Sequence, residues 1–180
     1  MTYLLRKINP NKWQPNVGKE SARHSADAIT GCTRTKSNTL SVWHSDTRDF
    51  DDESVQNLIV GLAITMPQPA KIDLLWLEED SLVGKGLKVT QTDPGSDYVA
   101  INPLHKDIEE LDHEGLGIVS EHIVEQFVEA QNYKQVPRPK LIGMVAQWAL
   151  KPDTFNLNDL NDSWLEAVKK HLETHSQLAA

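Results

Sequence analysis

The densest group of side chains that could do chemistry lies in the segment from residue 92 to residue 105. It offers one amide, one imidazole and two carboxylates, from Asn102, His105, Asp93 and Asp97. Together these groups could orient a ligand and move a proton, as a small hydrolase or nuclease would require. The segment follows a predicted strand, and such loops are where sites tend to sit. An ordinary loop whose Asn102 caps the next helix explains the same residues without a reaction, and we favour it.

Metal and cofactor sites are not predicted. His171 and His175 have metal-ligand spacing on one predicted helix, but Glu173 between them falls on another face. His113 and His122 are about 2.5 helical turns apart, so they lie on opposite faces, and a charged, solvent-facing surface explains them. No P-loop motif occurs, and the single cysteine excludes an internal disulfide and a Cys-rich zinc site. We therefore expect no bound metal and no cofactor.

A basic segment near the start of the chain is the candidate surface for nucleic acid. Its residues that could contact phosphate or stack on bases are Arg6, Lys7, Lys12, Trp13, Lys19 and Arg23. Cations interleaved with an aromatic ring suit a single strand. We favour the alternative that these cations pair with acidic helices of the same chain or of a copy, because the next region would repel phosphate.

Charge is sorted along the chain. Residues 1–48 hold eight Lys/Arg and three Asp/Glu (net +5), residues 49–132 hold four and eighteen (net −14), and residues 133–180 hold six and five (net +1), which sum to −8. Because summed charge governs steering and solubility rather than fold, this sorting predicts surfaces that meet other macromolecules. The acidic face is thus a candidate surface for binding proteins.

Hydrophobic periodicity predicts a mixed α/β sheet of about four strands with flanking helices. The strands are expected at residues 3–8, 39–44, 71–77 and 87–92. A helix capped by Asp51 or Asp52 runs from there to Met66. Local sequence therefore favours an α+β fold whose α/β part covers residues 1–105.

The remaining residues, 106–180, are predicted to be helical, either as a second domain or as an extension of one domain. A helix is expected from about Asp107 or Asp112 to Asn132, and a shorter one follows the prolines at 137 and 139. The last helix carries an apolar stripe of Trp164, Leu165, Val168 and Leu172. A Trp-anchored stripe can dock into a groove of a partner or pack on its own domain, and periodicity does not separate the two.

The opening residues lack the apolar core and cleavage site of a signal peptide. The longest apolar patch, at 58–66, is too short to span a bilayer. We therefore expect a cytoplasmic protein that makes no membrane contact. Oligomeric state is left open at this level.

Several short segments of the N-terminal half resemble a known group of proteins. They are Leu4-Leu5-Arg6-Lys7-Ile8, Trp13, Ala26-Asp27-Ala28-Ile29-Thr30 and Asn38-Thr39-Leu40-Ser41-Val42-Trp43. They are similar to the openings of small bacterial accessory proteins of mobile-element and defence operons. There, a non-enzymatic middle component accompanies an SMC- or ABC-type ATPase and an effector. The resemblance covers about a quarter of the chain, implies protein partners of those two kinds, and assigns no role to any residue.

The leading hypothesis is a non-catalytic adaptor or regulatory subunit of a bacterial multi-protein complex. It would bind proteins through its acidic face and its C-terminal helices. A small hydrolase or nuclease using the 93–105 loop is one alternative. A nucleic-acid-associated protein using the basic segment is the other.

Overall fold

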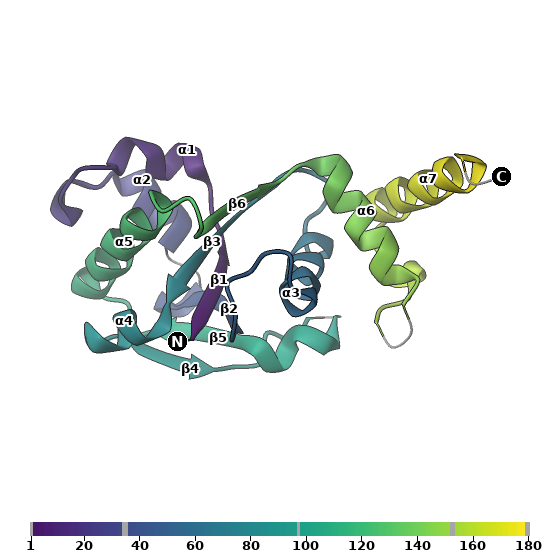
Figure 1. The fold of residues 1–180 in the computed structure, drawn as a ribbon. Coiled ribbons are helices and arrows are strands. Elements are labelled where there is room, and N and C mark those ends of the chain that lie inside the picture. Colours follow the sequence, from purple (N-terminus) through teal and green to yellow (C-terminus); the bar gives the residue numbers. More distant parts are fainter. Residues whose placement is uncertain (1, 34–35, 97, 152–153, 179–180) are drawn as a thin grey trace. The chain divides into compact units, whose positions relative to one another are not determined.

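The strands of this protein join in one six-stranded sheet with the order β4-β5-β2-β1-β3-β6 (Figure 1). The computed structural model describes residues 2–33, 36–96, 98–151 and 154–178. The strands are β1 (Tyr3–Lys7), β2 (Leu40–Ser45), β3 (Ile72–Glu78), β4 (Lys88–Gln91), β5 (His105–Glu109) and β6 (Tyr133–Val136). The mixed α/β class is confirmed, although the sheet has six strands where about four were predicted.

The first strand lies inside the sheet and pairs antiparallel with both β2 and β3. In this register Leu4 is opposite Leu77, and Leu5 is opposite Trp76. β5 corrects the prediction of a helix from about Asp107, since residues 105–109 pair antiparallel with β2 and β4. One buried residue of β5, Ile108, is opposite Leu40, and this long-range pairing outweighs the weak local β-propensity.

Helices occupy most of the connections between strands. The α-helices are α1 (Pro10–Trp13), α2 (Ala26–Ala28), α3 (Glu53–Ile64), α4 (Glu79–Gly84), α5 (His113–Phe127), α6 (Arg138–Ala149) and α7 (Asp162–Leu178). The short 3-10 segments are η1 (Gln14–Asn16), η2 (Ser21–Arg23), η4 (Lys36–Asn38), η5 (Val99–Leu104) and η6 (Leu157–Asp159), and η3 (Ile29–Thr33) is a π-helix. None of the described helices is both long enough and apolar enough to cross a lipid bilayer.

The predicted cap of α3 is confirmed, and α5 begins at Asp112, one of its two predicted starting points. Asp52 accepts the N–H of Ser54 at the start of α3, and Asp112 accepts the N–H of Gly115 at the start of α5. Each carboxylate satisfies a backbone donor that the helix itself leaves unpaired. α5 ends at Phe127, earlier than the predicted end at Asn132.

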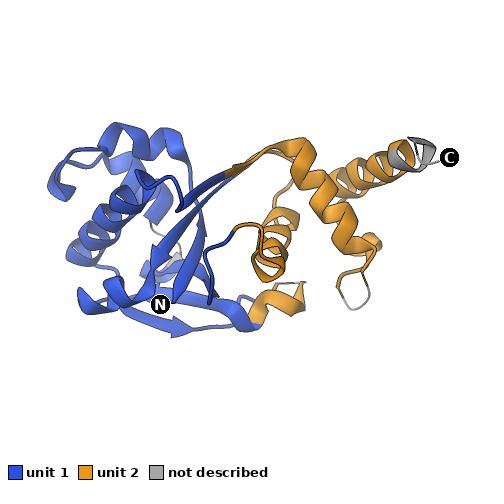
Figure 2. Ribbon diagram, in the orientation of Figure 1, with its two compact units in different colours: residues 1–49, 73–94, 103–134 blue, residues 50–72, 95–102, 135–180 orange. Residues whose placement is uncertain are grey.

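The chain forms two compact units, and each is assembled from three segments (Figure 2). Unit 1 contains residues 1–49, 73–94 and 103–134, and unit 2 contains residues 50–72, 95–102 and 135–180. Segments from both sides of residue 105 therefore contribute to each unit. The two units are interlaced along the sequence, whereas the expected α/β and helical parts follow one another.

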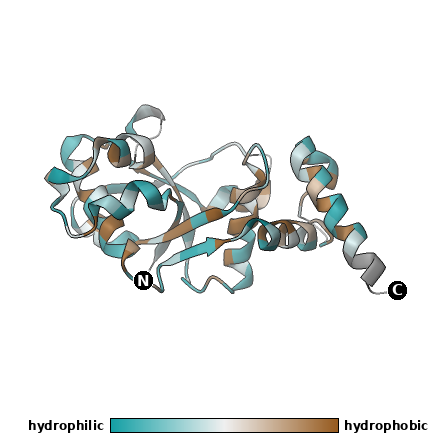
Figure 3. Ribbon diagram, turned by 90° about the horizontal axis from the view of Figure 1, so that it is seen from above, coloured by the Kyte–Doolittle hydropathy of each residue, from teal (hydrophilic) through white to brown (hydrophobic). Residues whose placement is uncertain are grey.

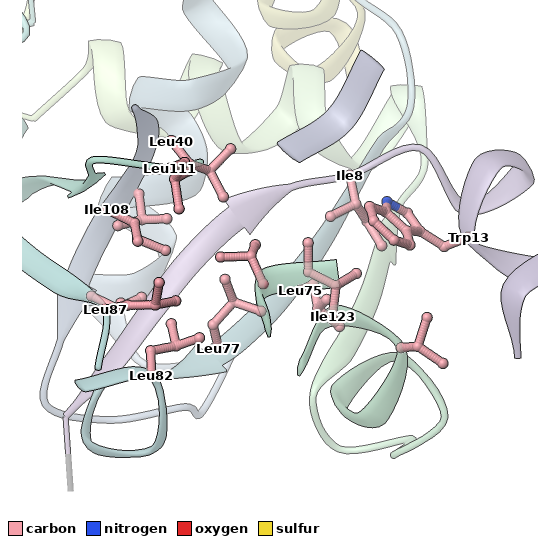
Figure 4. Close-up of a cluster of buried hydrophobic side chains, with 14 of the residues drawn as sticks. Ile8, Trp13, Leu40, Leu75, Leu77, Leu82, Leu87, Ile108, Leu111 and Ile123 are labelled. Carbon is pink, nitrogen blue, oxygen red and sulfur yellow. The ribbon is translucent and has the colours of Figure 1, made fainter. Parts of the chain in front are cut away.

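A cluster of buried apolar side chains forms the core of unit 1 (Figure 4). The strands contribute Leu4, Leu40, Val42, Leu75, Leu77 and Ile108 to it, and the helices contribute Trp13, Leu82, Val119 and Ile123. α5 thus supplies part of the cover of one sheet face, through the apolar stripe that its sequence predicts. Its opposite side stays exposed.

Unit 2 is built around α3, α6 and α7. Asn57 of α3 accepts two hydrogen bonds through Oδ1, from Trp148 Nε1 at 2.8 Å and from the hydroxyl of Tyr98. Hydrophilic and hydrophobic residues both occur along α7 (Figure 3). Trp164 of this helix is fully buried, and its Nε1 donates to the carbonyl of Met66 at 3.0 Å.

Candidate partner-binding surface

His105, the imidazole of the predicted catalytic set, is a buried member of a hydrogen-bond network within unit 1. Its Nδ1 lies 2.8 Å from Thr92 Oγ1, and the same hydroxyl donates to Asp107 Oδ2 at 2.8 Å. Because the hydroxyl has only one proton, His105 Nδ1 must be the donor in the first bond. The ring also packs edge-on against Trp43, with centroids 4.9 Å apart, and only 4% of His105 is exposed. This network fixes the imidazole in the sheet.

Asn102, another member of the predicted catalytic set, makes its hydrogen bonds elsewhere. Asn102 belongs to unit 2, where its Nδ2 donates to the carbonyl of Ser96 at 3.1 Å and its Oδ1 accepts the Ser96 hydroxyl. Asn102 therefore closes its own loop. Asp93 is exposed, and Asp97 lies outside the described residues. Among the described residues, no group of three His, Cys, Asp or Glu side chains is placed to hold a metal ion.

Internal contacts use half of the basic segment that was considered for nucleic acid. Trp13 is fully buried in the core of unit 1, so it cannot serve as the predicted stacking platform. Arg6 donates to the carbonyls of Ser41 at 2.6 Å and Cys32 at 3.4 Å, and burial lowers the pKa of its guanidinium. Lys12 Nζ lies 3.1 Å from Asp27 Oδ1.

Three basic side chains of the segment stay at the surface. They are Lys7, Lys19 and Arg23, and all three are exposed. Without an accessible aromatic ring among the six predicted residues, they offer charge but no base-stacking contact.

Part of the apolar stripe of the C-terminal helix is buried within the protein. Trp164 and Val168 are fully buried within unit 2, so these two side chains form its core and are not exposed anchors for a partner. Leu165 and Leu172 are partly buried. Contact of a partner with Leu165 and Leu172 stays a prediction.

The exposed side of α5 carries a line of carboxylates. Residues 107–133 contain eight Asp/Glu and no Lys or Arg. Of these, Glu114, Glu121 and Glu125 are exposed on α5, spaced by seven and four residues. Such spacing places them along one side of a helix. Figure 1 shows this helix beside α1 and α2, and all three belong to unit 1 (Figure 2).

Three lysines of unit 1 are paired with carboxylates other than those of Glu114 and Glu121. Lys88 Nζ lies 2.7 Å from Glu109 Oε2 and holds the pKa of that carboxyl below its usual range. Lys106 Nζ lies 2.7 Å from Glu79 Oε2, and Lys85 Nζ lies 3.5 Å from Glu125 Oε2. Within the described chain, neither Glu114 nor Glu121 forms an ion pair. Their charges are therefore available to an outside cation.

A hollow of about 440 Å³ opens beside these two glutamates. α5 meets η2 and η3 there, and the hollow is lined by Ser21, Ala22, His24, Ile29, His113, Glu114, Leu116, Gly117, Ile118 and Glu121. We call this feature the α5 hollow. It combines apolar side chains with two acidic ones, and its volume falls in the range of pockets that bind small groups.

Three histidines on or near α5 have different roles. His24 is buried between Ser120 Oγ at 3.0 Å and the Lys19 carbonyl at 3.1 Å, and it ties η2 to α5. His113 is exposed, as expected. The expectation of a solvent-facing His122 is wrong, because that side chain is 1% exposed and its Nε2 accepts the Glu78 N–H at 3.0 Å.

Comparison of the chain with family models, curated proteins and solved structures found no match. The case for a binding surface on α5 therefore depends only on the geometry of its carboxylates and of the α5 hollow. Its acidic character could be predicted from the charge count of residues 49–132. Its hollow could not, because Ser21, Ala22 and Ile29 come from a distant segment whose packing on α5 leaves no local pattern.

Proposed function

We propose that this protein is a non-catalytic accessory subunit that binds a basic surface of a partner protein through α5. The observation that carries the proposal is a pair of exposed carboxylates at the α5 hollow, Glu114 and Glu121, that form no ion pair with any described residue. The resemblance of the N-terminal segments adds support for a bacterial multi-protein system. The partner would then be the ATPase or the effector of that system.

Electrostatics explains why such a surface favours a basic protein. Like charges along one side of a helix repel each other, and a cationic partner removes this repulsion when it binds. A local field of one sign also raises the rate of encounter with an oppositely charged surface, and salt screens this effect. A folded partner can in addition fill the apolar part of the hollow.

The test is co-expression with the proteins encoded by neighbouring genes, followed by size-exclusion chromatography. We expect one of them to co-elute with this protein at low salt. In the variant Glu114→Gln/Glu121→Gln, the complex should weaken at least tenfold, which corresponds to about 1.4 kcal/mol. Complex formation by the wild-type chain should also weaken as salt rises.

A matched control is available in unit 2. Glu166→Gln/Glu173→Gln removes two exposed glutamates from α7, so it changes the net charge by the same amount. This control should leave the complex intact. If both double variants weaken the complex equally, net charge alone accounts for the binding and the α5 surface has no special role. Failure of every neighbour to co-elute would count against an accessory subunit.

A further inference from the structure

Gly117 of α5 is the residue in the α5 hollow that the packing of unit 1 does not explain. A Cβ added at this position would meet no atom within 4 Å. At Gly115, two residues earlier, the same atom would lie 3.3 Å from Leu87 Cδ2 and 3.4 Å from Leu111 Cδ2. Close packing therefore accounts for Gly115. Gly117 destabilises the helix relative to alanine without relieving any contact.

The consequence of Gly117 is that the hollow stays open next to the backbone of α5. Ile29, Leu116 and Ile118 provide apolar lining around it. Glu114 and Glu121 lie on either side of Gly117 along the helix, about two turns or 10.5 Å apart. An apolar opening thus lies between two carboxylates that pair with no cation in the part of the chain that the structure describes.

We propose that the α5 hollow receives one large apolar side chain from an amphipathic helix of the partner protein. This side chain packs over Gly117, while lysines or arginines about one turn before and after it pair with Glu114 and Glu121. The proposal rests on the proposed function and names the recognition element that the partner must carry. It commits to a protein helix because cations two turns apart on a helix packed along α5 would match the spacing of about 10.5 Å between the two glutamates.

The probe for this proposal is a fluorescein-labelled, alanine-rich helical peptide. It has one leucine midway between two lysines that are two turns apart. Fluorescence anisotropy with the full-length protein should show saturable binding that weakens with salt. A peptide with serine in place of the leucine keeps the charge, and it should bind at least about tenfold more weakly.

The protein variant that tests the hollow is Gly117→Leu, which fills it from the helix side. We expect about a tenfold or greater loss of peptide affinity with an undiminished melting temperature, because the new side chain enters open space and leucine favours helix. Gly84→Leu is the matched control. Gly84 is the last residue of α4, and a Cβ added there would likewise meet no atom within 4 Å, but Gly84 does not line the α5 hollow. Its affinity should stay unchanged.

Several outcomes would overturn the proposal. They are absence of peptide binding to the wild-type protein, equal binding of the leucine and serine peptides, and unchanged affinity of Gly117→Leu. If Gly117→Leu lowers the melting temperature, the peptide affinity of Gly117→Ala and the affinity of the wild-type protein for the serine peptide test the proposal instead. Neither measurement places a large side chain in the protein. A co-expressed partner that tolerates Gly117→Leu but not Glu114→Gln/Glu121→Gln would leave the proposed function standing and remove only the apolar anchor.

Discussion

His122 joins α5 to the end of β3 through a neutral imidazole. Its Nε2 accepts the backbone N–H of Glu78, so the ring proton must be on Nδ1, which lies 3.4 Å from Glu125 Oε2. Burial lowers the pKa of this imidazole, and the positive charge of Lys85 acts in the same direction, while the carboxylates of Glu125 and Glu78 oppose them. Protonation would set an Nε2–H group against the Glu78 N–H.

The stability of the protein should therefore fall in mild acid. Because the pKa of His122 is lower in the folded chain, the unfolded chain takes up the proton first as pH falls below about 6.5. The contribution of His122 is complete above that pH, and it is lost at about 1.4 kcal/mol per pH unit between the unfolded and folded pKa values. Urea unfolding at a series of pH values measures this slope.

Two variants test whether His122 causes this pH dependence of the free energy of unfolding. His122→Gln cannot titrate, so the loss of stability below about pH 6.5 should become smaller. His113→Gln removes an exposed imidazole from the same helix, and the slope should stay as in the wild-type chain. An unchanged slope in His122→Gln would show that another group causes the acid response.

Helical periodicity predicted a solvent-facing His122, whereas the side chain is buried. Its position borders the apolar stripe of Val119 and Ile123, but an isolated histidine on a predicted helix usually faces water. Its burial depends on the Glu78 N–H, which comes from a strand 44 residues away. Such a partner cannot be read from the helix sequence.

At the level of elements, α3 and α6 of unit 2 are joined by the amide of Asn57. Its Oδ1 accepts from both Trp148 Nε1 and the Tyr98 hydroxyl, so one side chain satisfies two largely buried donors. An unmade bond to a buried donor costs about 1–3 kcal/mol, which is more than the net gain from a typical hydrogen bond. Asn57 is thus a small polar centre within an apolar unit.

Replacing this amide should destabilise unit 2 strongly. We expect Asn57→Leu to lower the free energy of unfolding by about 2–4 kcal/mol, because two donors lose their acceptor at once. Chemical denaturation monitored by tryptophan fluorescence gives the value. Gln147→Ala, at an exposed position of α6, should change it by less than about 0.5 kcal/mol. A loss at Asn57 no larger than at Gln147 would contradict the role assigned to the amide.

The elements that could be predicted are those with a strong local pattern. β1, β2, β3 and β4, and the helices α3, α5, α6 and α7, all coincide with alternating or helical runs of apolar residues. β5 and β6 were missed because each is short and polar, and neighbouring strands stabilise it. The same limit applies to the α5 surface, whose charge could be counted but whose hollow depends on a distant segment.

At the scale of the whole molecule, the interlaced units set how the chain can be divided. The chain passes from one unit to the other after residues 49, 72, 94, 102 and 134, five times in all. A cut at residue 105, where sequence patterns suggested a boundary, separates β5 and α5 from the rest of unit 1. Ile108, Val119 and Ile123 would then be missing from its core.

Residues 1–105 should therefore not fold when they are expressed alone. Loss of five buried aliphatic residues, Leu111 and Val124 among them, removes several kcal/mol of apolar burial, which is comparable with the total stability of a domain. Amide dispersion in NMR spectra and near-ultraviolet circular dichroism report on this directly. A cooperative unfolding transition of that fragment would show that its core is complete without α5.

The same connectivity has a practical side. A polypeptide severed between residues 94 and 95 would still have both pieces of each unit packed by non-covalent contacts, since every unit draws on both sides of the break. Two separately produced halves should thus recombine on mixing. A reporter split at this point would then give a signal only when the native assembly forms.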